Sequence, residues 1–169
     1  MTPLLAIDGH AVSGKSTLAT IVAHRLGGTV VRPFDEEKAA RLLGYAAQNR
    51  FDELERDTCA ILRDAEGSAV RRPAVFDRHW LTVLVHLPDG YAEHWRHRSP
   101  TYLCWCDLET TLARLCARVA HEPDREAHAW FVARYRELAE RLGVPLIDTV
   151  RLDPARAADL VVADLRHTS

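Results

Sequence analysis

The sequence predicts an α/β fold. Five short apolar segments alternate along the 169 residues with longer segments whose apolar side chains recur at helical spacing. Polar residues follow several of the apolar segments, as they do at the carboxyl ends of parallel strands. No repeat or low-complexity segment interrupts this alternation. These observations predict one domain, residues 1–169, with a parallel sheet and helices on both faces.

The composition argues against several classes of protein. With 22 basic and 24 acidic residues the formal net charge is −2, so no overall field recruits a nucleic-acid polymer. No apolar run reaches the roughly 20 residues of a membrane span, and the first strand begins too early for a signal peptide. We therefore expect a cytoplasmic protein without membrane contact. The oligomeric state stays open between a monomer and a homodimer.

Two residue types have an uneven distribution. Lysine occurs only at Lys15 and Lys38 while arginine is abundant, which reflects either GC-rich coding DNA or phosphate handling by guanidinium groups. Of the four cysteines, Cys104 and Cys106 alternate along an apolar strand. No second pair or nearby histidine completes a metal site with them, so we expect buried core thiols.

The first strand, residues 4–7, leads into a segment that matches G-x-x-x-x-G-K-[ST] in full. Its two glycines let backbone N–H groups converge on phosphate oxygens, and Lys15 places an ammonium on the β- and γ-phosphates. Ser16 is suited to Mg²⁺, and the helix expected over residues 17–26 adds its N-terminal dipole. The alternative is a glycine-rich turn that binds no nucleotide. The expected nucleotide-binding residues are Gly9, His10, Ala11, Val12, Ser13, Gly14, Lys15, Ser16 and Thr17.

A second strand is expected over residues 29–32, followed by a loop, residues 33–37, at its carboxyl end. That position suits an acceptor substrate, and Asp35 is the residue of interest. Asp35 is either a catalytic base or the N-cap of the helix that follows. Helical patterns then cover residues 38–43 and 46–65, with a break near Gly44.

The third strand, residues 73–76, ends in a charged pair. Asp77 is suited to hold Mg²⁺ through a water molecule, and Arg78 to grip a substrate phosphate. A surface ion pair is the alternative. The polar and aromatic segment 88–100 offers Tyr91, Trp95, Arg96 and Arg98 either to a substrate or to the surface of a helix.

The last third of the chain continues the alternation. The fourth strand covers residues 102–106, and the helix expected over 112–120 places Arg114 and Arg118 on one face. A polar break and a long helix follow, and then come the fifth strand and a final helix; these segments are residues 121–125, 126–142, 145–148 and 154–163.

With these residues in place, the chain resembles the P-loop nucleoside and nucleotide kinases, and the thymidylate kinases most closely. The family pattern of Asp-Arg-aromatic after a strand is similar to Asp77-Arg78-His79, and its Glu-x-x-Leu-x-Arg-Leu-x-x-Arg pattern is similar to residues 109–118. Asp124-Arg125-Glu126 resembles the start of the family's lid. The chain departs from the pattern at residues 32–35, where the family has Arg-Glu-Pro-Gly-Gly, and at His79, where Tyr or Phe is usual.

The resemblance implies a P-loop fold with sheet order 2-3-1-4-5 and a short helical lid at about residues 114–126. It also implies a kinase that transfers the γ-phosphoryl group of ATP, with Mg²⁺, to a nucleotide or nucleoside. Arg114 would contact ATP, and Arg118 and Arg125 would close over the transferring group. Two other readings stay open: a kinase for a hydroxyl of an antibiotic or sugar, with Asp35 as base, and a regulatory ATPase without an acceptor. ATP is expected over GTP because the Asn-Lys-x-Asp signature is absent.

Overall fold

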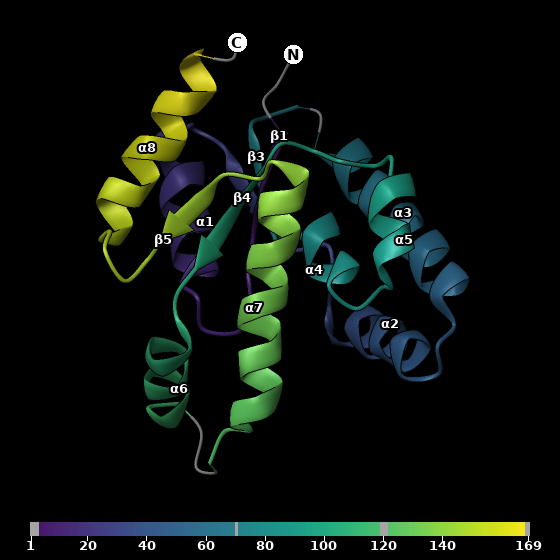
Figure 1. Cartoon of the computed structure of the whole chain (residues 1–169). Helices are drawn as coiled ribbons and strands as arrows, with labels where there is room; N and C mark the ends of the chain where they lie inside the picture. Colours follow the sequence, from purple (N-terminus) through teal and green to yellow (C-terminus); the bar gives the residue numbers. More distant parts are fainter. Residues whose placement is uncertain (1–3, 70, 119–121, 168–169) are drawn as a thin grey trace.

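A computed structural model describes residues 4–69, 71–118 and 122–167 (Figure 1). Its five strands form one parallel sheet in the order β2-β3-β1-β4-β5, which confirms the expected fold class and strand order. The strands are β1 (Leu4–Asp8), β2 (Thr29–Val31), β3 (Ala74–Asp77), β4 (Thr101–Trp105) and β5 (Leu146–Asp148).

Helices cover both faces of the sheet, as expected (Figure 1). α1 and α8 pack on one face, and α3, α4, α5 and α7 surround a separate core on the other. The helices are α1 (Lys15–Arg25), α2 (Glu36–Ala47), α3 (Phe51–Ser68), α4 (Trp80–Leu84), α5 (Asp89–His94), α6 (Leu108–Cys116), α7 (Arg125–Leu142) and α8 (Pro154–His167). Within the described residues, none of them is both long enough and apolar enough to cross a membrane.

The two cores follow from the alternation of side chains along each strand. Leu5 and Ile7 of β1 join the core under α1 and α8, whereas Ala6 packs on the opposite face. From Leu5 to Ile7 both faces of β1 are fully buried, which explains why this part of the strand is a continuous apolar run. Burying each Leu or Ile side chain contributes about 1.5–3 kcal/mol to folding.

The strand register brings the polar strand ends together. Ile7 of β1 lies opposite Asp77 of β3, and Asp8 lies opposite Leu103 of β4. The loop after β1 and the segment after β3 therefore start side by side at one edge of the sheet.

Several expected boundaries were wrong. α2 continues through Gly44 to Ala47, and the break falls at residues 48–50, where Asn49 has a φ of 55°. Apart from its chain neighbours and the backbone of its own helix, no atom of the described residues lies within 4 Å of the position that a Cβ at residue 44 would occupy. Gly44 therefore lowers the stability of α2 only through the low helix propensity of glycine. α6 ends at Cys116 rather than near residue 120, and α8 continues to His167.

Candidate active site

The segment that matches the phosphate-loop motif, called the phosphate loop below, lies between β1 and α1, as the sequence predicts. A side chain at Gly9 would come within 2.2 Å of the Cys104 carbonyl oxygen, so only glycine lets the loop pass this close to β4. Gly14, with a φ of 96°, is the N-cap of α1. Val12 also has a positive φ of 53°, which is unfavourable for a β-branched residue. Strain of this kind is typical of ligand-binding loops.

Lys15 lies inside the curve of this loop. Its Nζ donates to the carbonyl oxygen of His10 at 3.0 Å, and the residue is 5% exposed. Burial, followed by the charge of Arg78, lowers the pKa of Lys15 to about 8. The ammonium is therefore largely retained at neutral pH, and an anion on the loop would restore its charge fully.

His10 is the loop residue that the motif leaves unspecified. Its ring nitrogens lie 2.9 Å from the Ala11 carbonyl oxygen and 3.1 Å from that of Cys106. Burial lowers the pKa of His10 to about 4, so the imidazole is neutral around pH 7. A neutral imidazole carries one N–H: with Nδ1–H donating to Ala11, Nε2 accepts from the backbone N–H of Cys106 at 3.5 Å, which links the loop to the residue after β4 without adding charge.

Arg114 fastens the far side of the loop. Its guanidinium donates to the Val12 carbonyl oxygen at 3.2 Å and to the Thr149 carbonyl oxygen at 3.1 Å. The Thr149 hydroxyl in turn donates to the Ser13 carbonyl oxygen at 2.8 Å. α6 and the end of β5 thus support the backbone that would cradle a phosphate.

Asp77 and Ser16 are the residues expected to hold Mg²⁺. Asp77 is buried at the end of β3, and its Oδ2 accepts from Arg32 Nε at 3.2 Å. Its Oδ1 is buried and has no hydrogen-bond partner among the described residues. Ser16 is exposed in the first turn of α1. An unpartnered carboxylate oxygen beside a phosphate loop is suited to bind a cation that prefers oxygen ligands, such as Mg²⁺, either directly or through a water molecule of the cation.

Sequence reasoning missed Asp8, a fully buried carboxylate at the end of β1. Its Oδ1 accepts from the backbone N–H of His79 at 2.9 Å and from the Thr82 hydroxyl. Backbone N–H groups of Leu81 and Thr82 also donate to it. Asp8 therefore fixes the start of α4 against the strand that begins the phosphate loop. Its position directly before Gly9 was the only available signal.

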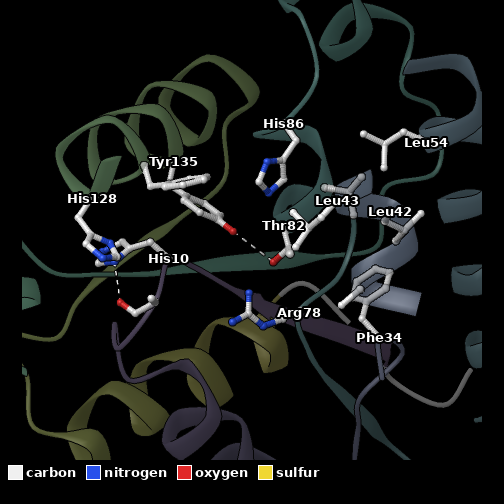
Figure 2. Close-up of a pocket in the computed structure, with 14 residues that line it drawn as sticks. His10, Phe34, Leu42, Leu43, Leu54, Arg78, Thr82, His86, His128 and Tyr135 are labelled. Carbon is white, nitrogen blue, oxygen red and sulfur yellow. Dashed lines mark hydrogen bonds between the residues drawn. The ribbon is translucent and has the colours of Figure 1, made fainter. Parts of the chain in front are cut away.

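A pocket of about 390 Å³ opens on one side of the loop (Figure 2). Figure 2 shows Phe34, Leu42, Leu43 and Leu54 gathered at one end, and the polar side chains of His10, His128 and Arg78 toward the loop. The remaining lining residues are Ala11, Ala39, Thr82, Val83, His86, Phe131 and Tyr135. Its size and its mainly apolar wall with a few polar groups are typical of small-molecule sites.

Arg78 reaches this pocket because the chain turns sharply after β3. Its φ is 80°, and its backbone N–H still donates to the Ile7 carbonyl oxygen at 3.1 Å. Beside it, the Tyr135 hydroxyl donates to Thr82 Oγ1 at 3.4 Å (Figure 2). Thr82 also bonds to Asp8, so the pocket wall is tied to the buried carboxylate.

A second pocket, of about 410 Å³, lies on the other side of the loop. Arg114 and Arg118 both line it, although Arg118 follows the end of α6 rather than lying within that helix. The other lining residues are Val12, Gly14, Thr17, Leu18, Thr149, Val150, Leu152, Asp153, Pro154 and Ala157.

Several expected residues line neither pocket: Gly9, Ser13, Lys15 and Ser16 belong to the loop or to the first turn of α1, Asp77 ends β3, and Asp35 and Arg125 have their polar contacts elsewhere. Asp35 caps α2 by accepting from the Lys38 N–H at 2.8 Å and pairs with Lys38 Nζ at 2.7 Å, with 57% of its side chain exposed. The expected N-cap is therefore observed. Arg125, the first residue of α7, pairs with Glu109 of α6, and both side chains are largely exposed. Residues 119–121 of the expected lid lie outside the described part of the chain.

The segment 88–100 is not part of the pocket. Trp95 is buried in the core, and Arg98 donates to the carbonyl oxygens of Trp95 and Ala92. Tyr91 bonds to Asp52 on α3. The polar groups of this segment thus hold α5 and its connection to β4 in place. The pocket is instead lined by the phosphate loop and by residues of α2, α3, α4 and α7, whose apolar residues have the sequence pattern of ordinary core positions.

No family model and no curated protein sequence matches the chain. Solved structures do. A deoxyadenosine kinase from M. mycoides with bound dATP is 15% identical, over 96% of this chain and 99% of that one, with a TM-score of 0.66. The YorR protein from Bacillus subtilis, in complex with phosphorylated GDP, is 16% identical over 98% of both chains, with a TM-score of 0.67. The fold of this chain is therefore the one seen in P-loop nucleoside and nucleotide kinases.

Proposed function

We propose that this protein transfers the γ-phosphoryl group of ATP to a nucleoside, or to a nucleoside monophosphate. The observation that carries the proposal is that the phosphate loop separates two pockets of similar size. His10 and Ala11 line one pocket, whereas Val12 and Gly14 line the other. A donor and an acceptor bound on opposite sides would place the transferring group over the loop.

The pocket with the two arginines suits the donor. Arg114 and Arg118 can contact the donor while the loop amides, Lys15 and Ser16 bind its phosphates. Asp77 and Ser16 would hold Mg²⁺, which neutralises charge on the β- and γ-phosphates when bound. ATP remains the proposed donor because the sequence lacks a guanine-reading Asn-Lys-x-Asp segment.

The pocket in Figure 2 suits the acceptor. The aromatic rings of Phe34, Phe131 and Tyr135 and the leucines of α2 offer surfaces for a base and sugar. Arg78 is the one guanidinium among its described lining residues and lies on the loop side. A neutral nucleoside fits this wall best, and a monophosphate is the second candidate because Arg78 can hold its phosphate. The solved kinase with dATP supports this substrate class. A specific thymidylate acceptor stays a prediction.

The two other functions expected from the sequence gain less support. For a hydroxyl kinase with Asp35 as base, the carboxylate would have to leave its contacts with Lys38 on the surface of α2. For a regulatory ATPase, the pocket beside Arg78 would have no substrate to hold.

An assay of ADP release with separate panels of nucleosides, nucleoside monophosphates, sugars and aminoglycosides tests the proposal. We expect release to require a nucleoside or its monophosphate and to yield the phosphorylated product by mass. ADP release at an equal rate without a second substrate would favour the ATPase. A response only to sugars or aminoglycosides would favour the other kinase.

A further inference from the structure

Three side chains with metal-binding atoms meet away from both pockets. Glu66 of α3, His79 after β3 and His97 before β4 each place one ligand atom within 4.8 Å of the others. His79 Nε2 lies 3.1 Å from Glu66 Oε1, and His97 Nε2 lies 3.1 Å from Glu66 Oε2. The two imidazole rings are close to parallel, at 16°. None of the three residues lines the donor or the acceptor pocket.

Both histidines lack hydrogen bonds that burial would normally demand. His79 is 0% exposed, and within the described residues neither of its ring nitrogens has a hydrogen-bond partner. The same holds for Nε2 of His97. The contacts with Glu66 are close in distance but lack the direction of a hydrogen bond. Buried polar atoms are nearly always paired in folded proteins, because leaving one unpaired is unfavourable, so these nitrogens call for a further partner.

The donor set identifies the kind of partner. Two imidazole nitrogens and a carboxylate oxygen are a common set for Zn²⁺, which binds at about 2.0–2.2 Å to each. Each imidazole nitrogen lies 3.1 Å from a different oxygen of Glu66, near the roughly 3.3 Å between neighbouring ligand atoms of a tetrahedral ion, so the carboxylate lies between the two imidazoles and either oxygen can serve as the ligand. Mg²⁺ prefers oxygen ligands, so it does not suit this cluster. His97 is 25% exposed, which leaves a path for a water molecule as fourth ligand.

The surrounding residues hold the three ligands in position. The Ser99 hydroxyl donates to Glu66 Oε1, and Trp95 Nε1 donates to the His97 carbonyl oxygen at 2.9 Å. The ring of Phe76 packs edge-on against His79, 4.9 Å between centroids. Partners of this kind orient metal ligands before the metal arrives.

We propose that Glu66, His79 and His97 bind one Zn²⁺ ion. The ion joins α3 to the segment after β3 and to the segment before β4. His79 directly follows Arg78 in the sequence. The ion therefore fixes the turn that directs Arg78 into the acceptor pocket, although the ion itself lies outside that pocket. This role is structural, and it does not depend on which reaction the protein catalyses.

The test uses the full chain, purified without a polyhistidine tag and stripped with a chelator. Titration with Zn²⁺ should give one equivalent bound per chain, by calorimetry and by elemental analysis after dialysis. When the free Zn²⁺ concentration is about a hundred times its Kd, the Tm should rise by about 5–10 °C. Mg²⁺ at the same concentration should give no such rise. Co²⁺ in its place should show the visible absorption of a nitrogen- and oxygen-ligated ion.

Matched variants decide whether these residues are the ligands. Glu66→Gln and His97→Gln, which are partly exposed positions, should each lose the bound equivalent and the Tm rise. Glu93→Gln and His94→Gln, exposed on α5, are the controls and should keep both. If the wild-type chain takes up no stoichiometric Zn²⁺, or if Glu66→Gln and His97→Gln bind it as well as the controls do, the proposal is overturned. The cluster is then a set of polar contacts only.

Discussion

The two pockets beside the phosphate loop are built in different ways. The donor pocket is formed largely by the loop itself, the start of α1, α6 with the turn after it, and the segment after β5. The acceptor pocket takes residues from the loop, α2, α3, α4 and α7, which are widely separated in sequence. Both pockets combine segments that are far apart in the sequence, residues 12–157 on the donor side and residues 10–135 on the acceptor side, but they share no lining residue among those that the structure describes. We expect changes on the donor side to affect every substrate, and changes on the acceptor side to affect only the acceptor.

The largest effect should come from Lys15, because the proposed function assigns its ammonium to the β- and γ-phosphates, where donor and acceptor meet. Lys15→Ala removes the main side-chain charge on the β- and γ-phosphates, so turnover should fall on the order of 10²-fold or more. Circular dichroism should show an intact fold. Lys38→Ala, at the only other lysine, is the control and should keep its rate. A wild-type rate in Lys15→Ala would refute the assignment of the loop.

Arg78→Ala should separate the two pockets most clearly. It removes the one guanidinium on the acceptor side, so acceptor affinity should weaken about tenfold to a hundredfold, by calorimetry, while ATP affinity barely changes. Arg63→Ala, which removes an exposed arginine of α3 that lines neither pocket, is the matched control and should leave both affinities unchanged. Equal losses for both substrates would mean that Arg78 supports the architecture instead.

The pH dependence of ATP binding should report Lys15. Because the pKa of Lys15 is lowered to about 8, the ammonium is present below that pH and is lost as pH rises through it. The Kd for ATP should therefore rise above pH 8, by up to about tenfold per pH unit. Acceptor binding should not follow this slope. Lys15→Arg keeps its charge and should remove the slope, so a slope that persists in Lys15→Arg would assign the titration to another group.

The expected lid should have a smaller effect, carried by Arg118. Arg118 lines the donor pocket, whereas Arg125 lies in an exposed pair with Glu109. Arg118→Ala should lower kcat more than it raises KM for ATP, on the order of tenfold, and Arg125→Ala should do less. Steady-state kinetics on both variants measure this. A larger kcat loss in Arg125→Ala would show that its pair with Glu109 opens during the reaction.

The smallest effect should come from Asp35. Its carboxylate caps α2 and pairs with Lys38, and asparagine is also a good N-cap. Asp35→Asn should therefore change kcat less than about twofold between pH 6 and 8. A loss of an order of magnitude or more across pH 6 to 8, where the lowered pKa of Asp35 keeps its carboxylate ionised, would instead indicate that Asp35 acts as a base.

The sequence predicted what depends on local pattern. The loop from Gly9 to Ser16 is a contiguous motif whose geometry follows from its glycines, and the strand order follows from the family resemblance. The acceptor pocket could not be predicted in the same way. Leu42 and Phe131 have the spacing of ordinary core residues, and only the packing of α2 and α7 shows that they line a pocket. Residues 88–100 looked suited to a substrate but pack as structural support.

Long-range partners were equally hidden. His79 was noted only as a departure from a family pattern, because nothing in the sequence places it beside Glu66 and His97. Asp8 is one acidic residue before a glycine, and its role depends on N–H groups more than 70 positions later. The predicted helix boundaries near Gly44 and Cys116 were wrong for a different reason. The position at which an exposed helix ends depends on small differences in free energy.

The contacts of Asp8 also bear on the order in which the molecule folds. A fully buried carboxylate is costly until its donors arrive, and here those donors belong to residues 79–82. The chain between Asp8 and these donors, which includes α1, β2, α2 and α3, has to be synthesised before the charge of Asp8 can be compensated. The position of Asp8 before the phosphate loop is thus linked to docking of the segment after β3 and of α4, and a fragment that ends before residue 79 would lack all of these donors. Ribosomal synthesis reaches this condition only when nearly half of the chain has been made.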